Sequence, residues 1–213
     1  MQFELTKDFL DNVIIAIDNE DTGFLVEQVN PLHPADIAEI MDIVNLPQAQ
    51  YIYKILDEEL ASNVLVEIEE DTREKFLASF STEEIAESLE KMYADDATDV
   101  IQDLPNEVQE EVLEALKDEE HSSEITTLLN YGEDSAGGIM DLDFISANWN
   151  WTLKSALNKF REQVEEVDNV YTIYVVDGEK RLKGTLSLKS FLYASDETLI
   201  KDIYTSDPIG VGV

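Results

Sequence analysis

The sequence predicts a multidomain chain, in which an all-α superhelix of helical repeats is followed by a small β-α-β-β-α unit. Apolar residues recur at helical spacing through residues 1–130, in a weak repeat of about 24 residues. Later in the chain the pattern changes to short β-branched and aromatic runs. We therefore expect a helical domain over residues 1–130, a joint over 131–143, the β-α-β-β-α unit over 144–195 and the start of a truncated second such unit over 196–213.

The first helices are marked by apolar spacing and by prolines. A helix over residues 6–17 is predicted by five apolar residues, Phe9, Leu10, Val13, Ile14 and Ile17. A second helix over residues 24–29 ends before Pro31, because the residue before a proline avoids the α region. Pro34 opens the third helix, where its missing N–H group costs nothing.

Two sets of apolar positions carry the repeat. One set is spaced by 23, 25 and 23 residues and consists of Ile37, Leu60, Ile85 and Val108. The other is spaced by 24 and 24 residues and consists of Ile52, Phe76 and Val100. Ser81 and Glu84 have the spacing of a capping box, and a last helix is expected over residues 122–129. Because such short helix pairs cannot each bury their apolar face alone, they must stack into a solenoid.

After the joint, at which Gly137 and Gly138 allow a sharp turn, the elements are shorter. We expect a strand over residues 144–147 and a helix capped by Thr152. The run 172–176 suits a buried strand, and its hairpin partner over 182–186 follows a turn at Asp177-Gly178. A unit of this size buries little surface alone, so we expect it to pair with another copy or chain.

The composition excludes several classes of partner. Fourteen basic against 48 acidic residues leave a net charge of −34, which repels nucleic acid and anionic membranes. The chain has no cysteine, and its longest obvious apolar run, residues 13–17, is too short to span a membrane. Since no secretory signal is evident, we expect a soluble chain in the cytoplasm. No catalytic triad or phosphate-binding loop is present, so we do not expect an enzyme.

The most suggestive acids are Asp95 and Asp99, which are four residues apart and so share a helical face, with Asp103 one turn further. Carboxylates this close repel one another until a divalent cation binds beside them. The alternative is that acids in the first turn of a helix complement its dipole and need no ligand. His33 and His121 are far apart in sequence and are expected to be packing or surface residues.

Four motifs together resemble one family. The motifs at 33–39, at 94–99, at 133–140, and at 173–177 with 182–188 are similar, in order, to the cytosolic part of MgtE-type magnesium transporters. The resemblance implies an N-terminal helical domain followed by the first CBS domain of a tandem pair. It further implies a homodimer formed through the CBS domains and a transmembrane pore domain attached to it on the cytoplasmic side of the membrane.

The resemblance also implies the function and the cofactor. Mg²⁺ would bridge acidic faces of the two domains, compact the dimer and hold the attached pore shut. By position in the family's motif, Asp95 and Asp99 are implied metal contacts, and Asp96 is a neighbouring candidate. Asn63 departs from the family's pattern where an acid could assist a bridging site. Because Mg²⁺ keeps several waters and takes one or two carboxylates, scattered acids suffice.

Two alternatives remain open. CBS domains elsewhere bind adenine nucleotides through Gly-x-x-Ser/Thr-x-x-Asp, and the corresponding residues here are Gly184, Ser187 and Ser190, so the acid is missing. A nucleotide-binding CBS module with a helical adaptor is therefore the second hypothesis, which titration with ATP or AMP would test. The third is an acidic scaffold for a basic protein, which retention of partners at moderate salt would test.

Overall fold

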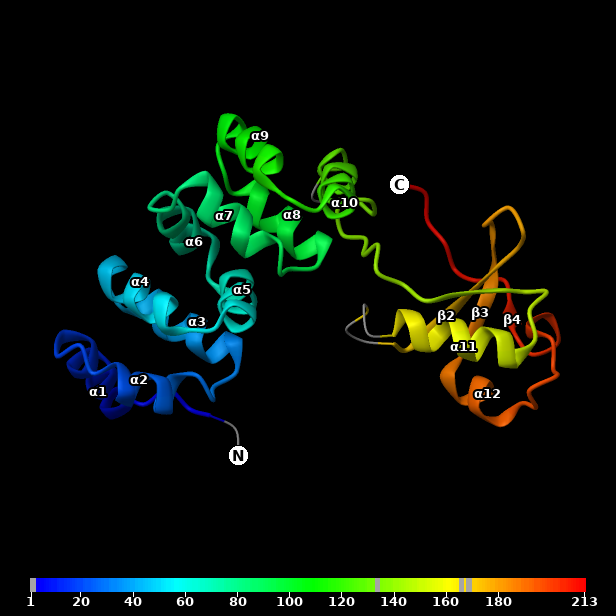
Figure 1. Cartoon of the computed structure of the whole chain (residues 1–213), viewed down its shortest axis with the longest axis horizontal. Coiled ribbons are helices and arrows are strands. Elements are labelled where there is room, and N and C mark those ends of the chain that lie inside the picture. The colour runs from blue at the N-terminus through cyan, green and yellow to red at the C-terminus, as the bar shows by residue number, and fades with distance from the viewer. Residues whose placement is uncertain (1–2, 133–134, 165–166, 168–169) are drawn as a thin grey trace. The chain divides into compact units, whose positions relative to one another are not determined.

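The computed structural model describes residues 3–132, 135–164, 167 and 170–213, and its course is drawn in Figure 1. The chain divides into two compact units, Met1–Glu133 and Asp134–Val213. Glu133 and Asp134, which open the motif at 133–140, lie outside the described residues. In the described parts of the chain, no helix combines the length and the apolar character that crossing a bilayer requires.

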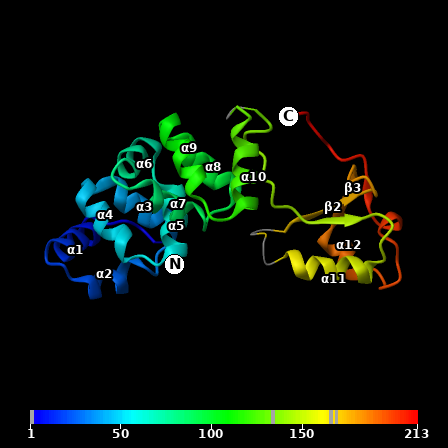
Figure 2. The same cartoon turned by 45° about the horizontal axis from the view of Figure 1, so that its top comes forward.

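The described part of the first unit is an array of ten helices, which Figures 1 and 2 show from two angles. They are α1 (Lys7–Asp18), α2 (Thr22–Val29), α3 (Pro34–Ile43), α4 (Leu46–Ile55), α5 (Glu58–Glu67), α6 (Glu70–Leu77), α7 (Thr82–Leu89), α8 (Ala94–Gln102), α9 (Asn106–Ala115) and α10 (Glu119–Leu129). Contacts of α3 with α5, α5 with α7 and α7 with α9 link successive pairs. The predicted helical-repeat architecture is confirmed.

The repeat positions form the core of this unit. Five of the seven repeat positions are at most 2% exposed, namely Ile37, Ile52, Phe76, Ile85 and Val100. Leu60 and Val108 are half-buried. The period of the sequence therefore reports which side of each helix faces its neighbours.

Side-chain caps decide where the helices begin. The predicted capping box of α7 is present, since the Glu84 N–H donates to Ser81 Oγ and the Ser81 N–H to Glu84 Oε2. Helix α10 begins at Glu119, three residues before the predicted start at residue 122. The reason is Asp118, whose Oδ1 accepts from the N–H groups of Glu120 and His121.

In the described part of the second unit, four strands form a sheet in the order β1-β2-β3-β4. Strand β1 (Ser146–Asn148) is parallel to β2 (Thr172–Val176). Strand β3 (Leu182–Ser187) pairs antiparallel with β2, and β4 (Thr205–Ser206) pairs antiparallel with β3. The helices are α11 (Leu153–Gln163), α12 (Leu188–Tyr193) and the 3-10 turn η1 (Ile200–Asp202). The β1-α11-β2-β3-α12 order confirms the predicted β-α-β-β-α fold.

One face of this sheet is covered and the other is open. Ile173 and Val175 of β2 are buried in a core with residues of α11 and α12. The alternate β2 residue Tyr174 is 38% exposed, because side chains of a strand point to opposite faces in turn. Ile200 belongs to the same core and β4 pairs with β3, so residues up to 206 pack with this sheet.

The turn between β2 and β3 is longer than the Asp177-Gly178 turn expected from the sequence. It runs through Arg181, and Asp177 Oδ1 accepts from the N–H groups of Glu179 and Arg181 at 2.9 and 3.0 Å. The positive φ, 60°, falls on Lys180, and none of the described glycines has a positive φ. The carboxylate rather than a glycine thus shapes the turn, and Gly137 and Gly138 do not use the wider range of glycine backbone angles.

Candidate functional site

Helix α8 carries the three acids predicted to contact metal. Its apolar side is buried through Ala97, Val100 and Ile101, so the acids lie toward the rim of that packed face. Asp95 and Asp96 are half-buried, and Asp99 is exposed. Asp95 Oδ1 accepts the backbone N–H of Asp96 at 3.0 Å. Asp95 and Asp96 are in the first turn of the helix, at the positive end of its dipole, which stabilises them with or without a cation.

Asp103, one turn beyond Asp99, is held by a basic side chain. Its Oδ2 lies 2.5 Å from Arg73 Nε, and the two side chains are 9% and 11% exposed. Arg73 also donates from Nη1 to the carbonyl oxygen of Val66 at 2.8 Å. Asp103 is therefore neutralised by a structural ion pair that ties α6 to the end of α8, which leaves Asp95, Asp96 and Asp99 as the candidates.

The described residues do not form a preassembled metal cage, since they contain no group of three or more His, Cys, Asp or Glu side chains arranged around one point. Asn63 is exposed on α5, a helix that contacts α8. The assignment of Asp95, Asp96 and Asp99 to Mg²⁺ stays a prediction. A hydrated Mg²⁺ is compatible with this arrangement, because it needs one or two protein carboxylates and keeps most of its waters.

The acidic charge is concentrated in the first unit. Residues 1–133 contain 35 acidic and 6 basic residues, a net charge of −29, whereas residues 134–213 contain 13 acidic and 8 basic residues. Charge of this density disfavours the compact state by self-repulsion and attracts counter-cations. The helical unit is thus the part of the chain with the stronger electrostatic attraction for divalent cations.

Both histidines make local structural hydrogen bonds. His33 caps α3, and its Nδ1 accepts the backbone N–H of Ala35 at 3.3 Å. His121 Nε2 lies 3.0 Å from the carbonyl oxygen of Leu89, at the end of α7. Each ring therefore takes part in local helix structure, in keeping with its expected role as a packing or surface residue.

The open sheet face of the second unit borders a cavity of about 580 Å³. Among its lining residues are Phe144, Tyr171, Tyr174, Lys180 and Leu182. The cavity has a mainly apolar, aromatic wall, and its charged lining residues are Lys180, Asp141 and Asp143. The aromatic wall suits an aromatic ligand, and Lys180 offers one contact to an anionic part beside two acidic residues.

The residues of the nucleotide pattern have other roles in this structure. Gly184 leaves room for β4, because a Cβ atom there would lie 2.1 Å from the carbonyl oxygen of Thr205. Ser187 caps α12, accepting the N–H of Ser190 at 3.1 Å, and the two hydroxyl oxygens are 2.9 Å apart. Ser187 and Ser190 do not line the cavity described above.

A charged cluster at the β2–β3 turn was not predicted from the sequence. Asp177 Oδ2 lies 3.0 Å from Lys183 Nζ and 3.3 Å from Arg181 Nε. Backbone N–H donation from Arg181, followed by the bond from Lys183, holds the pKa of the Asp177 carboxyl well below its usual range. The alternation of Asp177, Arg181 and Lys183 along a hairpin is the signal that could have found this cluster. It fixes the turn that carries Lys180 to the cavity.

Similarity to known proteins covers both units. Residues 32–134 match the family model for the MgtE intracellular N domain. The magnesium transporter MgtE of Thermus thermophilus is 28% identical over 190 residues, which are 88% of this chain and 42% of the relative. MgtE of Enterococcus faecalis is 38% identical over 94 residues, 44% of this chain and 21% of that protein. The chain thus spans less than half the length of these relatives.

Two solved structures extend the similarity to the whole fold. The crystal structure of the soluble part of a magnesium transporter is 28% identical, with a TM-score of 0.79 over 95% of this chain and 80% of the other. The cytosolic domain of the Mg²⁺ channel MgtE in complex with ATP is 26% identical, with a TM-score of 0.85 over 95% of this chain and 82% of the other.

The chain thus shares its helical-repeat domain followed by a β-α-β-β-α unit with the soluble part of a magnesium transporter and with the cytosolic domain of the Mg²⁺ channel MgtE. The match to the family model, the relatives and the two solved structures together support an MgtE-type cytosolic region. Both of these curated relatives are magnesium transporters.

Proposed function

We propose that this chain senses Mg²⁺ and regulates the pore of a magnesium transporter from the cytoplasmic side of the membrane. The observation that carries the proposal is the net charge of −29 on residues 1–133, with Asp95 and Asp99 one helical turn apart on α8. At high Mg²⁺ the ion binds between acidic faces, relieves their repulsion and favours a compact state that holds the pore shut. At low Mg²⁺ the repulsion returns and the pore is released.

In this mechanism the acidic residues of the chain repel one another and make weak contacts to a hydrated Mg²⁺ ion. Asp95, Asp96 and Asp99 offer carboxylate oxygens on one short helix, and Arg73 keeps Asp103 from adding to their charge. A divalent cation is better than a monovalent one at this task, because it neutralises two carboxylates at once. The pore domain is the implied partner, since the chain matches 42% of the length of a magnesium transporter.

The decisive test is small-angle scattering coupled to size exclusion, with and without excess Mg²⁺. A NaCl sample of matched ionic strength separates screening from binding. The proposal predicts compaction beyond the NaCl sample, which is lost when Asp95→Asn and Asp99→Asn are combined. The matched control is Asp8→Asn with Asp11→Asn, an equal change on exposed residues of α1. Equal compaction in NaCl and Mg²⁺ would contradict Mg²⁺ sensing by this chain.

The open sheet face supports pairing with a second β-α-β-β-α unit, including that of a second copy in a homodimer. Phe144, Tyr174 and Leu182 are 50%, 38% and 46% exposed around the cavity. Burying such side chains favours association by the hydrophobic effect. Sedimentation equilibrium should give a dimer that Tyr174→Lys weakens, whereas Tyr193→Lys on α12, whose side chain is 82% exposed outside the cavity, is the control. A monomer at every concentration would contradict the pairing.

A second candidate function, adenine-nucleotide binding, is favoured by the same cavity. The related MgtE domain was crystallised with ATP, and the cavity here combines Tyr171 and Phe144 with the Lys180 ammonium. The missing acid at Ser190 argues for weak binding. Calorimetric titration with ATP should give saturable heat that Tyr171→Ala removes and Tyr193→Ala retains. Absence of saturable heat with the unmodified chain would refute this function.

A further inference from the structure

A second cavity, of about 520 Å³, lies within the helical unit, away from the acids of α8. We call it the α5–α7 groove, and its wall is formed by residues of α4, α5 and α7 and by the segments that follow α4, α6, α7 and α9. The apolar floor consists of Tyr53, Leu56, Ala61 and Phe80. The rings of Tyr53 and Phe80 meet edge to face at 5.6 Å. A volume of this size suits a small organic ligand.

The polar groups of the floor are satisfied internally. Tyr53 Oη is 3.0 Å from Ser88 Oγ, and Ser88 Oγ donates to the carbonyl oxygen of Glu84. Ser62 Oγ lies 3.0 Å from the carbonyl oxygens of Glu58 and Ser88. Since these hydroxyl groups are already hydrogen-bonded within the protein, we expect the charged side chains at the rim of the groove to select the ligand.

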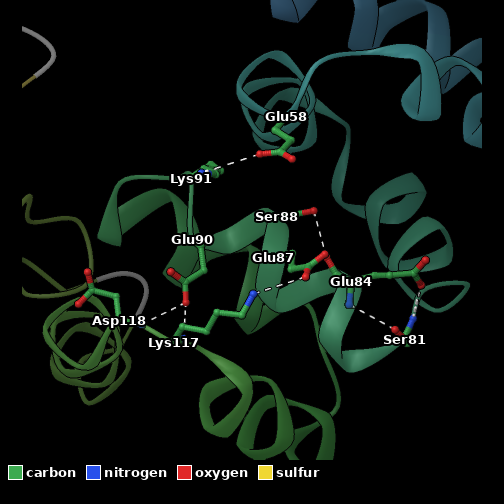
Figure 3. A network of polar contacts seen from close by, with 9 residues as sticks. All are labelled: Glu58, Ser81, Glu84, Glu87, Ser88, Glu90, Lys91, Lys117 and Asp118. Carbon is green, nitrogen blue, oxygen red and sulfur yellow. Dashed lines mark hydrogen bonds and ion pairs between the residues drawn. The ribbon is translucent and has the colours of Figure 1, made fainter.

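Three of the six basic residues of the helical unit line this one groove: Lys54, Lys91 and Lys117. Lys54 makes no ion pair with a described residue. Lys91 Nζ is 3.9 Å from Glu58, and Lys117 Nζ is 3.5 Å from Glu87, as Figure 3 shows. The groove has three lysines to four glutamates, whereas the whole unit has 6 basic to 35 acidic residues, so cationic groups are enriched in the groove.

The other two glutamates of the rim are engaged elsewhere. Glu84 accepts the backbone N–H of Ser81 in the capping box of α7. Glu90 Oε1 accepts the N–H groups of Lys117 and Asp118, and so holds the segment before α10 beside the groove (Figure 3). Three lysines therefore share the rim with four glutamates, of which Glu84 and Glu90 are held by backbone N–H groups, while Glu58 and Glu87 pair with Lys91 and Lys117.

We infer that the α5–α7 groove binds a small organic anion with an aromatic or apolar body. The body packs on Tyr53, Leu56 and Phe80, and the anionic group takes the ammonium groups of Lys54 and Lys117. Without a ligand, the carboxylates of Glu58 and Glu87 pair with Lys91 and Lys117 in the place that the anion would take. Their ion pairs have exposed side chains, between 51% and 86% exposed, so exchanging them costs little.

The probe is anilinonaphthalene sulfonate, an aromatic anion that fluoresces in an apolar site. Its matched control is N-phenylnaphthylamine, which has the same aromatic body without the sulfonate. The unmodified chain, free of Mg²⁺, should bind the sulfonate saturably and at least about tenfold more tightly than the uncharged amine, because charge-assisted contacts add to the apolar ones. Equal affinity for both probes would overturn the proposal.

Three double variants locate the site. Lys54→Gln with Lys117→Gln should weaken sulfonate binding by about 5- to 30-fold, whereas Lys7→Gln with Lys75→Gln, the same charge change outside the groove, should alter it less than about twofold. Glu58→Gln with Glu87→Gln should tighten binding, since it frees the lysines. Circular dichroism checks that each variant is folded.

The opposite signs of the lysine and glutamate variants distinguish the groove from any other apolar site. Loss of binding with Lys180→Gln, in the cavity of the second unit, together with no effect of the groove variants, would overturn the inference. So would a glutamate variant that weakens binding, since that result would show the carboxylates contributing to the site rather than competing with the ligand.

Discussion

The ion pair between Arg73 and Asp103 should be among the strongest single polar contributions to the stability of the helical unit. Both side chains are about nine-tenths buried, and Arg73 also satisfies the carbonyl oxygen of Val66. Exposed ion pairs contribute about 0–1 kcal/mol, but removing one partner of a buried pair costs about 3–5 kcal/mol, because it leaves an uncompensated charge. We expect Arg73→Met to lower the free energy of unfolding by about 3 kcal/mol.

A double-mutant cycle isolates this interaction. Urea unfolding followed by far-ultraviolet circular dichroism reports mainly the helical unit, which contains most of the described helices. Arg73→Met combined with Asp103→Leu should cost much less than the two single changes together, because the double change removes both charges. Lys91→Met with Glu58→Leu is the control cycle on an exposed pair, with a coupling below about 1 kcal/mol. Additivity within about 0.5 kcal/mol at Arg73 and Asp103 would refute the reasoning.

Three further predictions concern single residues. Gly184→Ala should detach β4 and raise hydrogen exchange at Thr205, because its Cβ would overlap the Thr205 carbonyl oxygen; unchanged exchange would contradict this. Burial raises the pKa of Tyr53, so above a pH of about 10 the hydroxyl ionises more readily in the unfolded state, and the unmodified chain should lose stability relative to Tyr53→Phe. Parallel plots of the free energy of unfolding against pH would contradict that. The pKa of Asp177 is depressed in the folded state, so its carboxylate contributes stability above the unfolded pKa of about 3.9, and Asp177→Asn should lower the melting temperature at neutral pH. The difference in melting temperature should shrink as the solution is acidified through the folded pKa. A difference that stays constant with pH would contradict this account.

The fold could be predicted because its signals are local. The 24-residue period marks residues such as Ile52 and Val100, which are fully buried. Boundaries were less predictable where a side chain caps a helix before its apolar pattern begins, as Asp118 does for α10. The turn at Asp177 was also incompletely predicted, because hydrogen bonds of its carboxylate place the positive φ on Lys180.

The sites were less predictable because they join residues distant in sequence. Arg73 and Asp103 are 30 residues apart, and neither motif nor spacing pairs them. The lysines of the α5–α7 groove come from three separate segments, so composition alone counts them as scattered charges. Asp95 and Asp99 could be singled out because they lie on one helix, but spacing does not tell a metal contact from acids that complement the helix dipole.

The two proposed ligands of the helical unit should assist each other. Apart from Arg73 and the three groove lysines, the basic residues of this unit are Lys7 and Lys75, so six basic residues stand against 35 acidic ones and leave a large negative charge. Long-range repulsion from these acids opposes an anion in the α5–α7 groove, and Mg²⁺ on acids elsewhere reduces that repulsion. Sulfonate affinity should therefore rise with Mg²⁺ more than with NaCl of equal ionic strength, and the anion must raise the affinity for Mg²⁺ by the same factor. An equal rise in both salts would show screening alone, and a fall in Mg²⁺ would place the cation in the groove itself.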